Sequence, residues 1–317
     1  MKRAFVFPGQ GSQFPGMGKE LADASATARH LFEEVDDALS QHLSRLMFEG
    51  PEIDLMLTEN AQPALLAASL AVMRVLEAEA GFDIAQGSNG VAYVAGHSLG
   101  EYSALAAARA VSVPDAARLV KQRGQAMQKA VPVGEGAMAA LLGLDIAAAR
   151  EVAQEASAGD LVCAVANDNS PGQIVVSGHA AAVAHAIALA AGRGSRRSIM
   201  LPVSAPFHSP LMQPAAEIMK DALADARFAR PAVPLVANVT AKETSDPDEI
   251  KELLVEQVTH IVRWRETVEL FAANEVEEVV ELGAGRVLSG LVKRINRDLA
   301  TCSVGTPADL DALLKRR

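Results

Sequence analysis

Residues 91–105 read VAYVAGHSLGEYSAL, and this stretch decides the fold. Its first five residues are apolar and rich in β-formers, which predicts a buried strand. Gly96-His97-Ser98-Leu99-Gly100 follows, and good helix formers continue from Glu101. A serine on a G-x-S-x-G turn between a strand and a helix is typical of a nucleophile elbow. The pattern predicts an α/β fold with Ser98 as a catalytic nucleophile, although a tight turn without any chemistry has the same local pattern.

The composition favours a globular protein with reduced thiols. Half of the 317 residues are hydrophobic, and the only two cysteines form neither a disulfide framework nor a C-x-x-C metal site. No uninterrupted apolar stretch reaches the ~18 residues of a membrane span, and the stretch MKRAFVFPGQ lacks the apolar segment of a signal peptide. The net charge of −10 argues against nucleic acid as a partner. We expect a cytoplasmic protein that needs no metal or other cofactor and binds no membrane.

Strands and helices alternate along most of the chain, which predicts a parallel sheet covered by helices. The expected strands are 3–7, 91–95, 233–238, 277–283 and 301–304. The expected helical segments are 17–48, 64–80, 114–130, 211–226, 248–273, 286–297 and one from Pro307.

The middle of the chain follows another order. Strands are expected at 137–144, 161–166, 173–178 and 198–203, with helices at 145–156 and 179–191 and a turn-rich linker at 167–172. This β-α-β-β-α-β order is the split motif of a ferredoxin-like unit. We therefore expect residues 132–202 to form a small domain inserted into a larger one made of residues 1–131 and 203–317.

A serine hydroxyl is a weak nucleophile and needs a general base within hydrogen-bond reach. Among the seven histidines, His208 lies in a Pro-flanked loop after a predicted strand, where catalytic histidines of α/β folds occur. His97 is next to Ser98, and consecutive side chains on such a turn point apart, so we expect His97 to line the pocket instead. No Asp or Glu stands out as a third catalytic residue.

Two further features can shape a pocket. Arg123 lies on the expected helix 114–130, where it either runs along the surface or binds a substrate carboxylate with its planar guanidinium. The glycine-rich loop 9–18 lacks the G-x-G-x-x-G and G-K-[ST] patterns of nucleotide sites. We expect it to be a ligand-contacting loop that carries Gln10 and Gln13.

Eight stretches in a fixed order carry a resemblance over essentially the whole chain. They are FVFPGQGSQ at 5–13, QPALLA at 62–67, GHSLGEYSAL at 96–105, KQRG at 121–124, GAMAALLGL at 136–144, NDNSPGQIVVSG at 167–178, PVSAPFHSPLM at 202–212 and ELGAGRVLSGL at 281–291. The sequence resembles the malonyl-CoA:acyl-carrier-protein transacylases of type II fatty-acid synthesis, and also the acyltransferase domains of polyketide and fatty-acid megasynthases.

The resemblance implies an α/β-hydrolase-like core with a ferredoxin-like insertion. It also implies ping-pong transfer of malonyl from malonyl-CoA through Ser98 to the phosphopantetheine thiol of acyl carrier protein, by a chain that we expect to act as a monomer. The resemblance implies that His208 is the base and is held by backbone carbonyls, and that Gln10 and Leu99 donate backbone N–H groups to the oxyanion hole. It implies that Arg123 binds the malonyl carboxylate. The pocket would be lined by His97, Gln62 and Asn169.

Two positions bear on specificity and on the base. In related megasynthase domains, a bulky aromatic at the position of Phe207 accompanies malonyl selection, and a smaller residue accompanies methylmalonyl. One methyl group in an apolar pocket is worth only ~1–3 kcal/mol, so we expect partial discrimination. Family members often have Pro-Val before the residue that precedes the tryptophan, whereas this chain has Ile261-Val262 before Arg263-Trp264. The missing proline puts the carbonyls that hold His208 in question.

Other functions share parts of this pattern. A serine esterase or thioesterase uses the same elbow with water as the acceptor, and a non-catalytic scaffold can keep the fold. A polyketide pathway or a malonate decarboxylase system would use the same transferase chemistry. Docking of an acidic carrier protein would require a basic patch, for which the candidates are Arg193, Arg196 and Arg197, or Lys293, Arg294 and Arg297.

Overall fold

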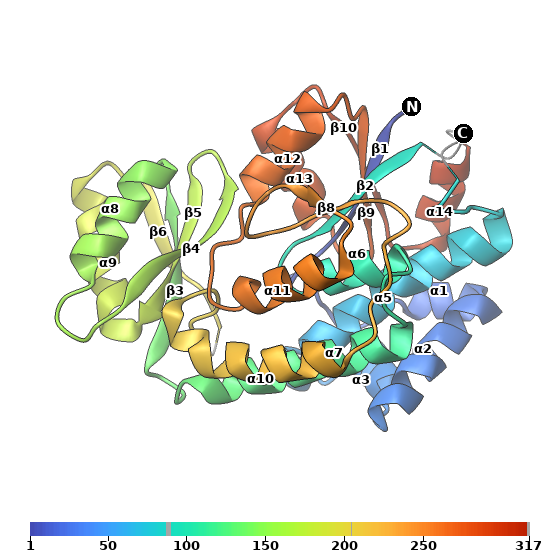
Figure 1. Cartoon of the computed structure of the whole chain (residues 1–317), viewed down its shortest axis with the longest axis horizontal. Helices are drawn as coiled ribbons and strands as arrows, with labels where there is room; N and C mark the ends of the chain where they lie inside the picture. Colours follow the sequence, from blue (N-terminus) through green and yellow to red (C-terminus); the bar gives the residue numbers. More distant parts are fainter. Residues whose placement is uncertain (87–89, 204, 316–317) are drawn as a thin grey trace.

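The structure is a computed structural model that describes residues 1–86, 90–203 and 205–315. Residues 87–89, just before the strand that leads to Ser98, lie outside the described residues, as do Ser204 in the stretch 202–212 and residues 316–317. The described chain forms a mixed α/β fold with one six-stranded and one four-stranded sheet (Figure 1).

The six-stranded sheet is parallel except at one edge. Its strand order is β10-β9-β1-β2-β7-β8, and only β7 and β8 pair in antiparallel fashion. The expected strand at 233–238 is cut to the two residues of β7, and β8 was not expected. The strands are β1 (Arg3–Phe7), β2 (Val91–Gly96), β7 (Leu235–Val236), β8 (Glu243–Thr244), β9 (Glu278–Leu282) and β10 (Ala300–Val304).

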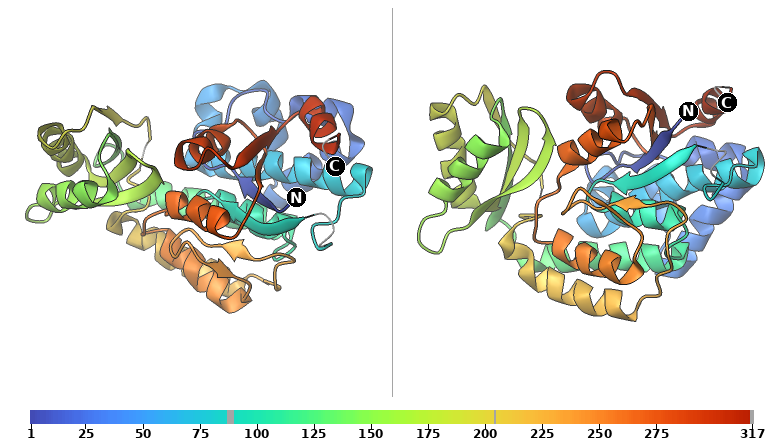
Figure 2. Two further views of the ribbon diagram at one scale, coloured as in Figure 1. Left: turned by 90° about the horizontal axis from the view of Figure 1, so that it is seen from above. Right: turned by 45° about the horizontal axis from the view of Figure 1, so that its top comes forward.

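Both faces of this sheet are covered by helices, as its near-continuous apolar strands predict (Figure 2). Along β1, Phe5 and Phe7 join the core on one side, and Ala4 and Val6 join the core on the other. The first side packs against α5 (Thr58–Ala80), α6 (Gly100–Ala107) and α7 (Val113–Ala130). The second packs against α12 (Trp264–Ala273) and α13 (Val287–Ile295).

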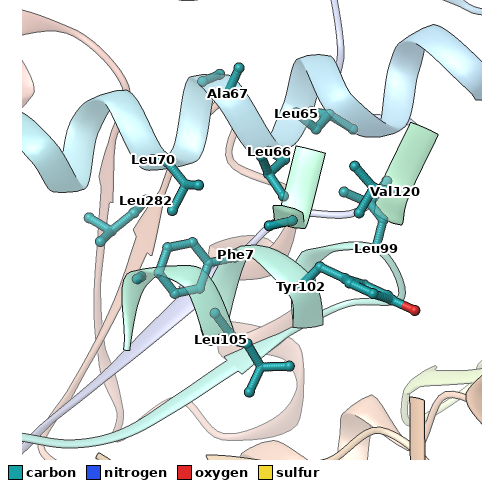
Figure 3. Close-up of a cluster of buried hydrophobic side chains, with 14 of the residues drawn as sticks. Phe7, Leu65, Leu66, Ala67, Leu70, Leu99, Tyr102, Leu105, Val120 and Leu282 are labelled. Atoms are coloured by element: carbon teal, nitrogen blue, oxygen red, sulfur yellow. The ribbon is translucent and has the colours of Figure 1, made fainter. Parts of the chain in front are cut away.

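Helix α5 is the centre of the first layer, where Leu66 and Leu70 lie close to Phe7 (Figure 3). It begins at Thr58 rather than at 64, and it continues through Pro63, which lies near the start of the helix and removes only one backbone donor. Helix α5 has the length and mean hydropathy of a membrane span, but 83% of its apolar window is buried inside the protein. It is therefore a core helix.

The remaining helices of this part surround the first layer. The expected helical stretch 17–48 is confirmed as three helices, whereas the single stretch expected at 248–273 is wrong. Helix α11 ends at Gln257 and α12 begins at Trp264, because the residues between them pair with β4 of the second sheet. The bounds are α1 (Lys19–Ala24), α2 (Ala26–Leu39), α3 (Leu43–Glu49), α4 (Glu52–Leu55), the 3-10 turn η2 (Pro210–Met212), α10 (Gln213–Asp225), α11 (Pro247–Gln257) and α14 (Pro307–Leu314).

The four-stranded sheet is antiparallel and has the order β4-β5-β3-β6. The expected alternation of strands and helices is confirmed, and two helices cover one face of the sheet (Figure 1). The linker expected at 167–172 is wrong, because β4 continues to Ser170 and only Pro171-Gly172 make the turn. The elements are β3 (Gly136–Leu142), α8 (Ile146–Ala156), β4 (Cys163–Ser170), β5 (Gln173–His179), α9 (Ala180–Gly192) and β6 (Arg197–Met200).

The two sheets meet close to Ser98. The backbone N–H of Asp168 on β4 donates to the carbonyl oxygen of Val262 at 3.0 Å, and the N–H of Val262 donates to Ala166 at 2.9 Å. Arg265 adds an ion pair with the buried Asp168 at 2.8 Å. These contacts fix the second sheet to the segment between α11 and α12 and to the start of α12.

Candidate active site

The turn after β2 holds Ser98 in a strained backbone conformation. Ser98 lies between the end of β2 and the start of α6 with a φ of 53°, which is uncommon for a residue with a side chain. A Cβ on Gly96 would lie 1.8 Å from the Gly100 backbone carbon, and one on Gly100 would lie 2.2 Å from the Phe7 carbonyl oxygen. Only glycine therefore fits on either side of the serine.

His208 lies within hydrogen-bond reach of Ser98, although the two are 110 residues apart in the chain. The distance from His208 Nε2 to Ser98 Oγ is 2.7 Å, and His208 Nδ1 lies 2.8 Å from the carbonyl oxygen of Gln257. A carbonyl only accepts, so Nδ1 carries the proton and Nε2 is left to accept the serine proton. No acidic residue is needed to fix this tautomer. The isoleucine at 261 leaves the carbonyl of Gln257 in place.

Burial, the largest effect, and the nearby positive charge of Arg123 together lower the pKa of His208 to about 3, while the hydrogen bond to Gln257 acts in the opposite direction. The base is therefore neutral at physiological pH. The unfolded chain binds a proton at this histidine below about pH 6.5, whereas the folded chain does not. The lowered pKa of His208 therefore decreases the free energy of unfolding as the pH falls from about 6.5 towards 3.

We expect kcat/KM for acylation of Ser98 to stay constant between about pH 5 and 7, because His208 is neutral across this range. With a histidine of ordinary pKa as the base, kcat/KM would fall roughly twentyfold from pH 7 to pH 5. A small thioester without a phosphate group is suitable for this measurement, since the substrate itself then does not titrate near neutral pH. A fall of more than about tenfold from pH 7 to 5 would contradict the shifted pKa.

Arg123 is buried beside the nucleophile, with only 1% of its surface exposed. Its Nη1 donates to Gln62 Oε1 at 2.9 Å, and its Nη2 donates to Gln257 Oε1 at 2.8 Å and to Ser98 Oγ at 3.1 Å. It forms no ion pair with any carboxylate of the described residues. Burial lowers its pKa, but a guanidinium remains charged in proteins. Such a site suits an acyl group that brings its own carboxylate.

A cavity of about 240 Å³ opens above Ser98. The predicted residues on its wall are Gln10, Gln62, His97, Leu99, Arg123, His208 and Phe207. Asn169, which was predicted to line the pocket, does not line this cavity, and its Oδ1 instead lies 2.8 Å from His97 Nε2. Asn167 of the same strand lines the cavity. The second sheet thus contributes both to the cavity and to the orientation of His97.

Two backbone N–H groups are available for an oxyanion. Those of Gln10 and Leu99 make no hydrogen bond with another described residue, whereas that of Ser98 donates to Asn238 Oδ1 at 2.8 Å. The loop with Gln10 lies against the elbow, since a Cβ on Gly9 would be 2.6 Å from the His97 carbonyl oxygen. This geometry can stabilise a tetrahedral intermediate on an acylated serine.

Residues 4–306 of the chain match the family described as the acyl transferase domain. The chain belongs to this family. It is 46% identical to the malonyl CoA-acyl carrier protein transacylase of Bacillus subtilis (strain 168) over 316 residues, 99% of this chain and 96% of that one. It is 44% identical to the Escherichia coli (strain K12) protein of the same name, over 98% of both chains.

Solved structures of other acyl transferases superimpose closely on this one. The acyl-carrier-protein-S-malonyltransferase of Bartonella henselae is 53% identical, with a TM-score of 0.96 and coverage of 100% of this chain and 99% of that chain. A malonyl-transacylase in complex with a type II PKS acyl-carrier protein is 40% identical, with a TM-score of 0.95 and full coverage of both chains.

Three buried residues of this acyl transferase site escaped the sequence analysis. The Gln257 amide donates to Ser98 O at 2.9 Å and to Glu101 Oε2 at 2.5 Å, in addition to its contact with Arg123. Asn238 contacts the turn itself. Burial raises the pKa of Glu101 to about 8, against the opposing effects of Gln257, Asn238 and Arg123. Only Glu101 falls within a motif, and no local pattern marks the other two.

A larger cleft of about 650 Å³ lies elsewhere, between α2, α5 and α7. Four of its charged side chains pair with one another: Arg74 pairs with Glu34, and Arg109 pairs with Glu77. It contains none of the residues around Ser98. The smaller cavity is therefore the better candidate site of this acyl transferase. Within the described residues, no group of three His, Cys, Asp or Glu side chains is placed to hold a metal ion.

Proposed function

We propose that this acyl transferase moves a malonyl group from malonyl-CoA to the phosphopantetheine thiol of acyl carrier protein, through an ester on Ser98. The buried Arg123 carries this proposal, because its Nη2 lies 3.1 Å from Ser98 Oγ and it has no carboxylate partner among the described residues. A malonyl group on Ser98 would supply that carboxylate, and an acetyl group would not. The names of the curated relatives support the same assignment.

In the first half-reaction, His208 Nε2 takes the Ser98 proton as Oγ attacks the thioester carbonyl. The oxyanion is held by the backbone N–H groups of Gln10 and Leu99. The C–S bond then breaks, and the imidazolium returns the proton to the departing thiolate of coenzyme A.

In the second half-reaction, the carrier thiol gives its proton to His208 and attacks malonyl-Ser98. The new C–S bond forms, the ester bond breaks, and Ser98 recovers its proton. Arg123 holds the malonyl carboxylate in both halves and so keeps the acyl group in place while the two thiols exchange.

The test uses the whole protein. Incubation with malonyl-CoA should increase its intact mass by one malonyl group, and addition of holo acyl carrier protein should move that group to the carrier. Release of free malonate in place of transfer would instead assign a thioesterase.

We also infer that residues 132–202 form a ferredoxin-like domain inserted into an α/β-hydrolase-like domain of residues 1–131 and 203–317. The antiparallel order β4-β5-β3-β6, with α8 and α9 on one face, supports the first name. The parallel strands around β1 and the elbow after β2 support the second.

Acyl carrier protein is proposed as the second substrate of this reaction, which we place in the cytoplasm. Of the two basic clusters, the first is partly neutralised, because Arg193 pairs with Glu155. In the second, Arg294 on α13 donates to Gln173 of β5, at the junction of the two sheets. We favour the second cluster for docking.

Phe207 is expected to limit methylmalonyl transfer. Its largely buried ring forms part of the cavity wall beside His208. Phe207→Ser should raise the ratio of methylmalonyl to malonyl transfer by about 5- to 150-fold, which corresponds to the ~1–3 kcal/mol of one methyl group. Competition between the two CoA esters measures this ratio. Phe228→Ser, at a phenylalanine that does not line the cavity, is the matched control. An unchanged ratio in Phe207→Ser would remove the proposed role.

A further inference from the structure

Asn238 lies at the carboxyl end of β7, next to the nucleophile turn. Strand β7 pairs with β2 through Leu235 and Val94, so both chains leave the sheet at the same edge. Asn238 follows β7 by two residues and is completely buried. A buried amide at this place must find hydrogen-bond partners.

Both ends of the Asn238 side chain bind the turn. Oδ1 accepts the backbone N–H of Ser98 at 2.8 Å, and Nδ2 donates to the carbonyl oxygen of Gly96 at 2.7 Å. One side chain thus spans the turn and binds the backbone on both sides of His97. Because a φ of 53° is disfavoured for serine, the turn keeps this shape only if its surroundings hold it.

Asn238 is itself held by three neighbours. The backbone carbonyl oxygen of Asn238 accepts from the backbone N–H of Arg263 at 3.0 Å, and the backbone N–H of Asn238 lies 3.4 Å from Glu101 Oε1. Gln257 Nε2 lies 3.4 Å from Asn238 Oδ1. The amide therefore has a fixed orientation towards the turn.

We infer that Asn238 is a positioning residue for the nucleophile. Asn238 acts by holding the Ser98 backbone, so that Ser98 Oγ points at His208 Nε2. Because Asn238 Oδ1 also accepts the backbone N–H of Ser98, the oxyanion is left to the backbone N–H groups of Leu99 and Gln10. The inference rests on Ser98 as the nucleophile of the proposed function.

The test compares Asn238→Asp and Asn238→Ala with the wild type. Asp keeps the acceptor for Ser98 N–H but loses the donor to Gly96, and Ala loses both. Asn274→Asp is the matched control on an exposed asparagine. Two rates are measured on folded protein: acylation of Ser98 by malonyl-CoA, and reaction of Ser98 with a fluorophosphonate, which requires no malonyl recognition.

Both rates should fall at least about tenfold in the Asn238 variants, since misplacing a nucleophile by ~1 Å can cost about a hundredfold. KM for malonyl-CoA and the ratio of malonyl to acetyl transfer should stay within about twofold of wild type. A merely structural role would lower thermal stability but leave the rates per folded molecule unchanged.

Rates within about twofold of wild type in folded Asn238→Asp would overturn the inference. If Asn238→Ala does not fold, Asn238→Asp and Asn238→Ser decide. If the wild type reacts with the fluorophosphonate but not with malonyl-CoA, the proposed substrate is wrong, and the fluorophosphonate rates still test Asn238.

Discussion

Ser98→Ala should form no malonyl-enzyme and should lose transfer activity by about 10⁴-fold or more, because the acyl group then has no oxygen to bind. His208→Ala should lose a comparable factor, since Ser98 Oγ has its only general base at 2.7 Å within the described residues. The double variant should be no worse than either single variant, because the two residues act as a unit. Quenched incubation with radiolabelled malonyl-CoA measures the covalent label, and steady-state transfer to holo acyl carrier protein measures turnover.

Two controls separate chemistry from folding. Ser198→Ala on β6 and His185→Ala on the exposed side of α9 are the matched replacements away from the cavity. Both should retain label and turnover. Stable label on Ser98→Ala would place the acyl group on another residue and would refute the nucleophile assignment.

Arg123→Ala should lower the preference for malonyl-CoA over acetyl-CoA more than any other single replacement. Malonyl transfer should fall by roughly 10²–10³-fold, because the malonyl carboxylate would enter a buried site without its cation. Acetyl transfer makes no use of this charge and should change by less than about tenfold. The ratio of kcat/KM for malonyl-CoA and acetyl-CoA measures the effect directly.

The control lies on the same helix. Arg118 is exposed on α7 and pairs with Asp115, so Arg118→Ala should leave the ratio unchanged. Arg123→Lys should recover only part of the selection, since an ammonium cannot donate to Gln62 and Gln257 in the fork geometry of a guanidinium. An unchanged ratio in Arg123→Ala would exclude the carboxylate clamp.

The sequence predicts those parts of the site that local patterns encode. The strand, the glycines and Ser98 lie within one stretch, and only a few histidines could serve as a base. The roles of Asn238 and Gln257 instead depend on which strands are neighbours and on where α11 ends. Their partners lie 140 and 159 residues away, at Ser98. No periodicity in a single sequence carries that information.

The errors in the fold have the same origin. Apolar periodicity continues through 248–273, but the pairing of Val262 with Ala166 and Asp168 interrupts the helix. Asn167-Asp168-Asn169 have the composition of a turn, yet the partner strand β5 keeps them in β4. In both places, contacts between distant segments override local preference.

The guanidinium of Arg123, which forms no ion pair within the part of the chain that the structure describes, also matters when no reaction takes place. A buried positive charge whose hydrogen bonds go only to amide and hydroxyl oxygens lowers the stability of the empty enzyme, and the Tyr102 ring beside it offsets only part of this cost. A malonyl ester on Ser98 would place a carboxylate beside this charge in the folded protein, whereas in the unfolded chain water solvates both charges. We therefore expect the acyl-enzyme to unfold less readily than the empty enzyme, so that the donor substrate also protects the fold of the protein that it loads.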